Sequence, residues 1–261
     1  MAAALRRRGP ALLGRFAGLR RYIPHRLWGT FSRRYPRTSE RLRRWVELRR
    51  TDGLLLSLIV IGAIYAASLF AGLVDEVYEA EELKAFDEAV FAAIESYRSA
   101  ALVAVFRFIT ALGSTETLVA VTLVATGFLL AHGPRRYVGP LWVVIVGSQL
   151  TTWMGKFLVD RGRPDFILDV TAASPSFPSA HAAGATAIYG VIAYALARDL
   201  PGSWRLHVGY WTVVLAALIG ASRVFLNVHF ASDVAAGHLV GIFWLLLGIA
   251  MAEHRRAGES G

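Results

Sequence analysis

The chain has 261 residues, 55% of them hydrophobic, and a formal net charge of +9 at pH 7. A mean hydropathy of +0.47 favours an integral membrane protein over a single soluble domain of this length. The chain contains no cysteine, which excludes disulfides and thiolate metal sites.

Residues 1–52 form a strongly basic segment, with fifteen arginines, three acidic residues and a net charge of +12. Positive charge beside a first membrane span favours the cytoplasmic side. Two interpretations stay open, and we favour a membrane-surface anchor over an organelle-targeting segment. Nucleic-acid binding is not predicted, because no such motif accompanies the charge. The anchor would be an amphipathic helix capped by Ser39, with one face made by Leu42, Trp45, Val46 and Arg49.

Six apolar segments are long enough to cross a bilayer, since about 20 helical residues span the roughly 30 Å hydrocarbon core. We therefore predict an all-α, polytopic membrane protein with one transmembrane domain over residues 53–252. The predicted spans are residues 53–74, 114–132, 137–158, 181–198, 207–225 and 231–252.

Residues 75–113, between the first two spans, are acidic at first and then more apolar. The apolar stretch from Ala100 to Gly113 is short and contains Arg107. We predict that it forms a helix on the extracytoplasmic membrane surface, and a further full span is the alternative.

The charges between the spans indicate one orientation. Residues 135–136, residues 198–205 and the tail 253–261 all carry arginines, and with six spans they fall on the same side as the N-terminus. Because arginine-rich loops stay in the cytoplasm, we predict a multi-pass protein of the cell membrane with both termini cytoplasmic. The acidic residues 75–95 then face outward.

Three short segments fall on the predicted outer side. They read K-x6-R-P from Lys156, P-S-A-H from Pro178 and S-R-x5-H-x3-D from Ser222. Their order and spacing resemble the signature of the type 2 phosphatidic acid phosphatase and vanadium haloperoxidase superfamily, over about residues 87–251. Coincidence is a poor explanation, because the chain holds only two lysines, Lys84 and Lys156. Ala180 stands where that family usually has glycine.

The segments suit the binding of a phosphate. Lys156, Arg163 and Arg223 can neutralise its charge, and arginine adds a planar fork of donors. Ser179 supplies a hydroxyl, and the backbone N–H groups around Ala180 point outward if a helix begins here. These donors could stabilise a transferring phosphoryl group with no metal or other cofactor. The alanine at position 180 should change rate or specificity only modestly.

Two histidines have separable roles. His229 and Asp233 are four residues apart, so they share one face of a helix. Asp233 can fix the tautomer of His229 and leave its other ring nitrogen free to attack phosphorus. His181, at a predicted helix start, is placed to protonate the leaving oxygen. The resemblance implies the same roles, with a phosphohistidine on His229 and with His181 then activating water as a base.

Three further polar residues carry weaker signals. Arg161 is either a phosphate contact or an interfacial anchor. Ser222 either closes a helix end or contacts phosphate, and we favour the first. His238 reads as a packed polar residue of the last span.

We predict a metal-independent lipid phosphatase with its site at the extracytoplasmic surface, whose partners are membrane lipids and a lipid phosphate substrate. The resemblance implies undecaprenyl pyrophosphate, phosphatidylglycerol phosphate, phosphatidic acid or diacylglycerol pyrophosphate. A phosphotransferase that uses the same site, and a non-catalytic lipid-phosphate binder or transporter, are the alternatives. The oligomeric state is left open.

Overall fold

The structure is a computed structural model that describes residues 51–79, 81–164, 174–198 and 200–259. The predicted basic segment 1–52, with its proposed anchor helix, lies outside these residues except for its last two. The chain divides into two units, Met1–Ser57 and Leu58–Gly261, and all the candidate site residues belong to the second.

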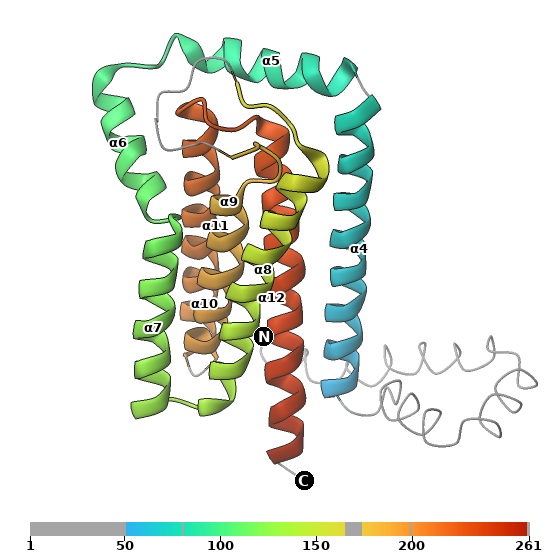
Figure 1. The fold of residues 1–261 in the computed structure, drawn as a ribbon. Coiled ribbons are helices and arrows are strands. Elements are labelled where there is room, and N and C mark those ends of the chain that lie inside the picture. The colour runs from blue at the N-terminus through green and yellow to red at the C-terminus, as the bar shows by residue number, and fades with distance from the viewer. Residues whose placement is uncertain (1–50, 80, 165–173, 199, 260–261) are drawn as a thin grey trace, which may run out of the picture. The chain divides into compact units, whose positions relative to one another are not determined.

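The described residues form helices and contain no strand, which confirms the predicted all-α class. All six predicted spans coincide with helices (Figure 1). The helices are α4 (Thr51–Glu79), α5 (Glu81–Glu95), α6 (Ala100–Ala111), α7 (Thr115–Ala131), α8 (Val138–Val159), α9 (Ala180–Gly184), α10 (Gly190–Ala197), α11 (Gly202–Phe225) and α12 (Ala231–Glu259). A short 3-10 turn, η2 (Arg135–Tyr137), precedes α8, and a π-helical turn, η3 (Ala185–Tyr189), joins α9 to α10.

Length and composition identify four membrane-spanning candidates among the described helices: α4, the continuous helix Ala180–Ala197, α11 and α12. A fifth is possible if α6 and α7, which meet at an angle of 45°, act together as one bent unit. Helix α8 is not among them, because Ser148, Gln149, Thr151 and Thr152 make its middle more polar. The count of six spans therefore stays a prediction.

The bend between α6 and α7 bears on the predicted surface helix at Ala100–Gly113. Ser99 caps the start of α6 and Ser114 caps the start of α7, each by accepting a hydrogen bond from a backbone N–H three residues ahead. The cap at Ser114, which closely follows the end of α6 at Ala111, explains why the chain starts a second helix here. A bent pair is compatible with a broken span or a re-entrant loop, so the prediction of a surface helix stays open.

Helix α12 packs against α8, α9 and η3, which places the start of α12 beside the start of α9. Two glycines make this close approach possible. A Cβ at Gly237 would lie 2.4 Å from the Ser179 carbonyl oxygen, and one at Gly241 would lie 2.6 Å from the Ala183 carbonyl oxygen. Apolar side chains fill the space next to these helices, with Leu141 and Ile188 almost fully buried.

The outward side of α4 is apolar. Ile61, Ile64 and Tyr65 are each more than 60% exposed. Such a surface would be costly in water and suits contact with lipid. This agrees with the prediction that α4 is a membrane helix.

Helix α5 was not predicted as a helix, because residues 75–95 were expected only to form an acidic segment that faces outward. It runs across the end of the other helices at which α8 ends and α12 begins (Figure 1). Val90, Phe91 and Ile94 lie on one face of α5 and pack against Val224 and Val234. The acidic segment is thus an amphipathic helix that covers this end of the second unit.

Candidate active site

The three motif segments meet at the end of the helices that α5 covers (Figure 1). Lys156 is in the last turn of α8, and Ser179 immediately precedes α9. Arg223 is in the last turn of α11, and Asp233 is in the first turn of α12. His229 lies in the short connection between these two helices. The structure therefore brings together residues that are up to 77 positions apart in the sequence.

Hydrogen bonds tie the segments to one another. The Ser179 backbone N–H donates to the Asp233 carbonyl oxygen at 3.0 Å, and Arg163 Nη1 donates to the Val228 carbonyl oxygen. The His229 N–H donates to the Arg223 carbonyl oxygen at 3.3 Å. The three motifs therefore form one site.

Lys156 and Arg163 both hold the segment that leads into Pro178. Lys156 Nζ donates to the Pro175 carbonyl oxygen at 2.5 Å and to Ser174 Oγ at 3.2 Å. Arg163 Nε donates to the Ser174 carbonyl oxygen at 2.6 Å. Lys156 is only 8% exposed. The two cations thus stand together, and each can turn its remaining donors to an anion.

Arg223 is buried and is held by a residue that was not among the predicted site residues. Its Nη1 donates to Thr110 Oγ1 at 2.7 Å, from helix α6. Thr110 is itself buried, 113 positions away in the sequence. Thr110 lies in an apolar stretch, and nothing in the sequence indicates that it pairs with Arg223.

The Ser179 hydroxyl is fully buried and finds no hydrogen-bond partner among the described residues. A buried hydroxyl without a partner is costly and is uncommon in proteins. Ser179 directly precedes α9 but makes no side-chain capping hydrogen bond to it. The first N–H groups of a helix favour anions. This agrees with the prediction that Ser179 donates to a bound phosphate, which stays a prediction.

Ala180 is the first residue of α9. Among the described non-glycine residues, only Asp160 and Asn227 have a positive φ. Ala180 does not, so its backbone conformation does not require glycine. This supports the expectation that the alanine has only a modest effect.

His229 and Asp233 face one another. His229 Nδ1 lies 3.5 Å from Asp233 Oδ2, which is an ion-pair distance and long for a hydrogen bond. Burial lowers the pKa of His229 to about 4, with Asp233 acting in the opposite direction and Arg223 and Arg163 adding to the decrease. The imidazole is therefore neutral near pH 7, as a nucleophile must be.

His181, the second residue of α9, is half-buried. The loop between α6 and α7 passes next to it: a Cβ at Gly113 would lie 3.4 Å from both Cβ and Cδ2 of His181. The residue that requires glycine here is Ile219, whose Cγ2 would lie 2.4 Å from such a Cβ.

The side chains of the three weaker candidates are also placed. Ser222 donates to the Ile219 carbonyl oxygen at 2.6 Å, which agrees with a role in its own helix. His238 Nδ1 lies 2.8 Å from Thr186 Oγ1, as expected of a packed polar residue. Arg161 contacts two carboxylates, Asp87 and Asp233, at 2.9 and 2.7 Å. Neither of the two interpretations of Arg161 anticipated these ion pairs.

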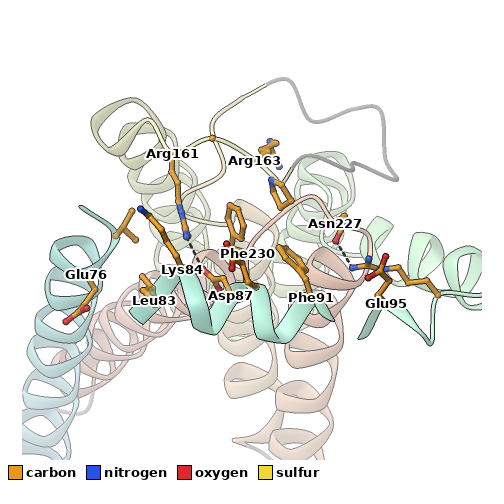
Figure 2. Close-up of a pocket in the computed structure, with 15 residues that line it drawn as sticks. Glu76, Leu83, Lys84, Asp87, Phe91, Glu95, Arg161, Arg163, Asn227 and Phe230 are labelled. Atoms are coloured by element: carbon orange, nitrogen blue, oxygen red, sulfur yellow. Dashed lines mark hydrogen bonds and ion pairs between the residues drawn. The ribbon is translucent and has the colours of Figure 1, made fainter. Parts of the chain in front are cut away.

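A cleft of about 630 Å³ opens beside the motifs, between α5 and residues 161–164 (Figure 2). Its walls carry charges of both signs, including Lys84, Glu95, Arg98 and Arg163. Arg98 also fixes the connection that carries His229, because it donates to the Phe225 carbonyl oxygen at 3.0 Å and to Asn227 Oδ1 at 2.5 Å.

Within the described ranges, no three histidine, aspartate or glutamate side chains gather closely enough to hold a metal ion. The polar groups that the motif segments bring together are cations, a hydroxyl and backbone N–H groups, which are of the kind that bind anions.

Comparison with known proteins gives consistent matches. The sequence model of the PAP2 superfamily matches residues 137–257. Phosphatidylglycerophosphatase B of Bacillus subtilis is 34% identical over 168 residues, which cover 62% of this chain and 82% of that protein. Decaprenylphosphoryl-5-phosphoribose phosphatase of Mycobacterium tuberculosis is 39% identical over 90 residues, 33% of this chain and 45% of that protein.

The fold also matches a solved structure, that of a transmembrane PAP2 type phosphatidylglycerolphosphate phosphatase from Bacillus subtilis. The TM-score is 0.67 at 28% sequence identity, and the match covers 76% of this chain and 96% of that one.

Proposed function

The chain belongs to the PAP2 superfamily and is a phosphoric ester hydrolase with membrane helices, and on that premise we propose that it releases phosphate from a lipid phosphate through a phosphohistidine on His229. The observation that carries the proposal is the buried group of Lys156, Arg223 and the Ser179 hydroxyl beside a neutral His229. Buried cations around a neutral nucleophile suit a substrate that brings two or more negative charges.

In the proposed first step, His229 Nε2 attacks phosphorus and the bond from phosphorus to the leaving oxygen breaks. His181 gives its proton to that oxygen, so a lipid alcohol or a lipid monophosphate leaves. Asp233 supports the His229 tautomer in which Nδ1 carries the hydrogen. In the second step His181 takes a proton from water, whose oxygen attacks phosphorus and breaks the N–P bond.

The substrate we favour is phosphatidylglycerol phosphate, because the Bacillus subtilis relative and the matched Bacillus subtilis structure are both named for that activity. Phosphatidic acid, diacylglycerol pyrophosphate and undecaprenyl pyrophosphate offer the same phosphate chemistry. The test is phosphate release by purified protein from micelles of each of these four lipids, with a His229→Ala variant beside it. Release that depends on His229 is expected; none from any lipid would refute the proposal.

The same assay separates the alternative functions. A phosphotransferase would pass the phosphoryl group from His229 to an added lipid alcohol and yield a new lipid phosphate in place of inorganic phosphate. A binder or transporter would retain the lipid without cleaving it. Acid-labile, alkali-stable labelling of the protein by a ³²P-labelled substrate is the expected sign of the phosphohistidine.

We propose that this chemistry takes place on the extracytoplasmic side, as the arginine distribution predicts. A chain without cysteine allows a direct test with single cysteines. Tyr97 is 67% exposed at the motif end, and Gly202 begins α11 with no heavy atom within 4 Å of an added Cβ. In intact cells, a membrane-impermeant thiol reagent should label Tyr97→Cys alone. Labelling of Gly202→Cys alone would place the site in the cytoplasm, and detergent-treated membranes should label both.

The pKa of His229 gives a second expected result. Since burial lowers that pKa to about 4, from about 6.5 in a peptide, the ring should stay neutral as the pH falls to 5.5. It should gain a proton, and lose its nucleophilic nitrogen, only as the pH falls through about 4. The ¹⁵N spectrum of histidine-labelled protein in detergent measures this directly, and the signal is identified by its loss in His229→Gln. Protonation of His229 near pH 6.5 would contradict the expectation.

A further inference from the structure

Asp87 enters the site from a helix outside the residues that match the family model, which are 137–257. Helix α5 carries several charged residues, yet Asp87 alone among them is buried, at 1% exposure. It occupies the apolar face of α5, in register with Leu83, Val90, Phe91 and Ile94. Burying an unpaired carboxylate there would cost folding free energy, so Asp87 is expected to have hydrogen-bonding or charged partners.

All the partners of Asp87 belong to the motif region. Asp87 Oδ1 accepts from the Ser232 backbone N–H at 3.0 Å. Asp87 Oδ2 accepts from Ser232 Oγ at 2.5 Å and from Arg161 Nη2 at 2.9 Å. Figure 2 shows Arg161 extending down to Asp87 on α5. One carboxylate thereby ties α5 to the start of α12 and to the loop after α8.

Arg161 continues the connection to Asp233. While its Nη2 binds Asp87, its Nη1 donates to Asp233 Oδ1 at 2.7 Å and to Ser232 Oγ at 2.7 Å. Its Cζ lies 4.2 Å from the centre of the Phe230 ring. The planar guanidinium is therefore fixed at both ends and on one face, which a lysine could not reproduce.

Asp233 is left with one oxygen for the histidine. Oδ1 is bound by Arg161, while Oδ2 accepts from the Phe230 N–H at 2.9 Å and lies 3.5 Å from His229 Nδ1. The rotation of the Asp233 carboxylate, and so the position of Oδ2, is set by Arg161 on one oxygen and by the Phe230 N–H on the other. An arginine held only by Asp233 would be free to draw this carboxylate away from His229.

We propose that Asp87 and Arg161 are positioning residues of the hydrolytic reaction, which act through Asp233 to orient the imidazole of His229. This inference rests on the proposed function. Helix α5 then contributes to catalysis through Asp87, although Asp87 itself does not contact the substrate. Because Arg161 binds Asp87 as well as Asp233, its attraction to Asp233 is opposed by its attraction to Asp87. The orientation of the Asp233 carboxylate therefore depends on both ion pairs.

The test replaces Asp87 by asparagine, which keeps the shape and removes the charge. We expect kcat to fall about 10- to 100-fold, as for other partners that orient a reacting group, with KM changed less than about twofold. The inhibition constant of inorganic phosphate should stay the same, because the cations of the site are untouched. Arg161→Lys should show the same division between kcat and KM. Glu82→Gln, an equal charge change on the exposed side of α5, is the matched control and should keep full activity.

A double-mutant cycle distinguishes positioning from general stability. In an Asp233→Asn background, measured under single-turnover conditions, Asp87→Asn should lower the rate by less than about twofold, because the residue through which it acts is already altered. If the two losses multiply, or if Asp87→Asn raises KM without lowering kcat, the inference is wrong.

Ser232→Ala covers the case in which Asp87→Asn does not fold. It removes the hydroxyl between Asp87 and Arg161 and leaves both charges; a smaller loss of kcat with the same non-additivity is expected, and full activity would refute the inference. Wild-type protein that cleaves no lipid phosphate would overturn the proposed function itself. An active wild type with an equally active Asp87→Asn variant would overturn the inference alone.

Discussion

Replacing His229 by alanine should lower phosphate release by at least about 10⁴-fold, since the variant retains the cations but has no nucleophile. The buried site at the end of α11 should still bind phosphate, so the inhibition constant of inorganic phosphate should change far less than the rate. Steady-state assays on phosphatidylglycerol phosphate measure both. No covalent ³²P label should remain on the variant.

The matched control is His254→Ala, on the exposed side of α12 near its C-terminal end, which should keep full activity. The assays are repeated in EDTA, and the wild type should retain its rate, because cations rather than a metal would neutralise the phosphate. Full activity in His229→Ala would refute the mechanism. A wild type that EDTA inactivates and Mg²⁺ restores would refute the metal-independent part.

Replacing His181 by alanine should have the second largest effect, and that effect should depend on the leaving group. A lipid alkoxide is a poor leaving group and needs a proton, so the loss on phosphatidylglycerol phosphate should be about 10²- to 10⁴-fold. The loss on 4-nitrophenyl phosphate, whose leaving group has a low pKa, should be less than about tenfold. The ratio of the two kcat/KM values, variant against wild type, measures the difference.

A comparison variant shows whether the pattern is specific to the acid. Ser179→Ala removes a phosphate donor and should slow both substrates by similar factors. Equal losses on both substrates in His181→Ala would show that His181 is not the acid. Preferential loss on the alkyl substrate in both variants would point to a shared effect on the leaving oxygen.

Much of the helical architecture could be predicted from the sequence because it depends on local properties. An uninterrupted run such as residues 53–74 has no charged side chain, and its helix satisfies every backbone group within the segment. All six predicted segments lie in helices, with ends within a few residues except at α11, which begins at Gly202, and at the extended ends of α4 and α12. Helix α5 was missed, since its apolar face is broken by Asp87 and surrounded by acidic residues.

The motif residues could be found because their chemistry depends on short spacings. His229 and Asp233 are four residues apart and face one another. The prediction that they share one face of a helix was wrong, because α12 begins only at Ala231 and His229 lies in the connection before it. The groups that support them could not be found in this way. Thr110 meets Arg223 across 113 positions, and Asp87 meets Ser232 across 145.

The sequence by itself determined that the chain is helical and apolar, and which residues carry a phosphatase signature, because hydrophobic length and short spacing act over one or two helical turns. Only the tertiary structure decided that α5 closes the motif end, that Arg161 bridges two carboxylates and that a threonine of α6 holds Arg223. A charge pair between distant segments has no periodicity in the sequence. It exists because burial makes an unpaired charge costly, and only packing determines which partner lies within reach.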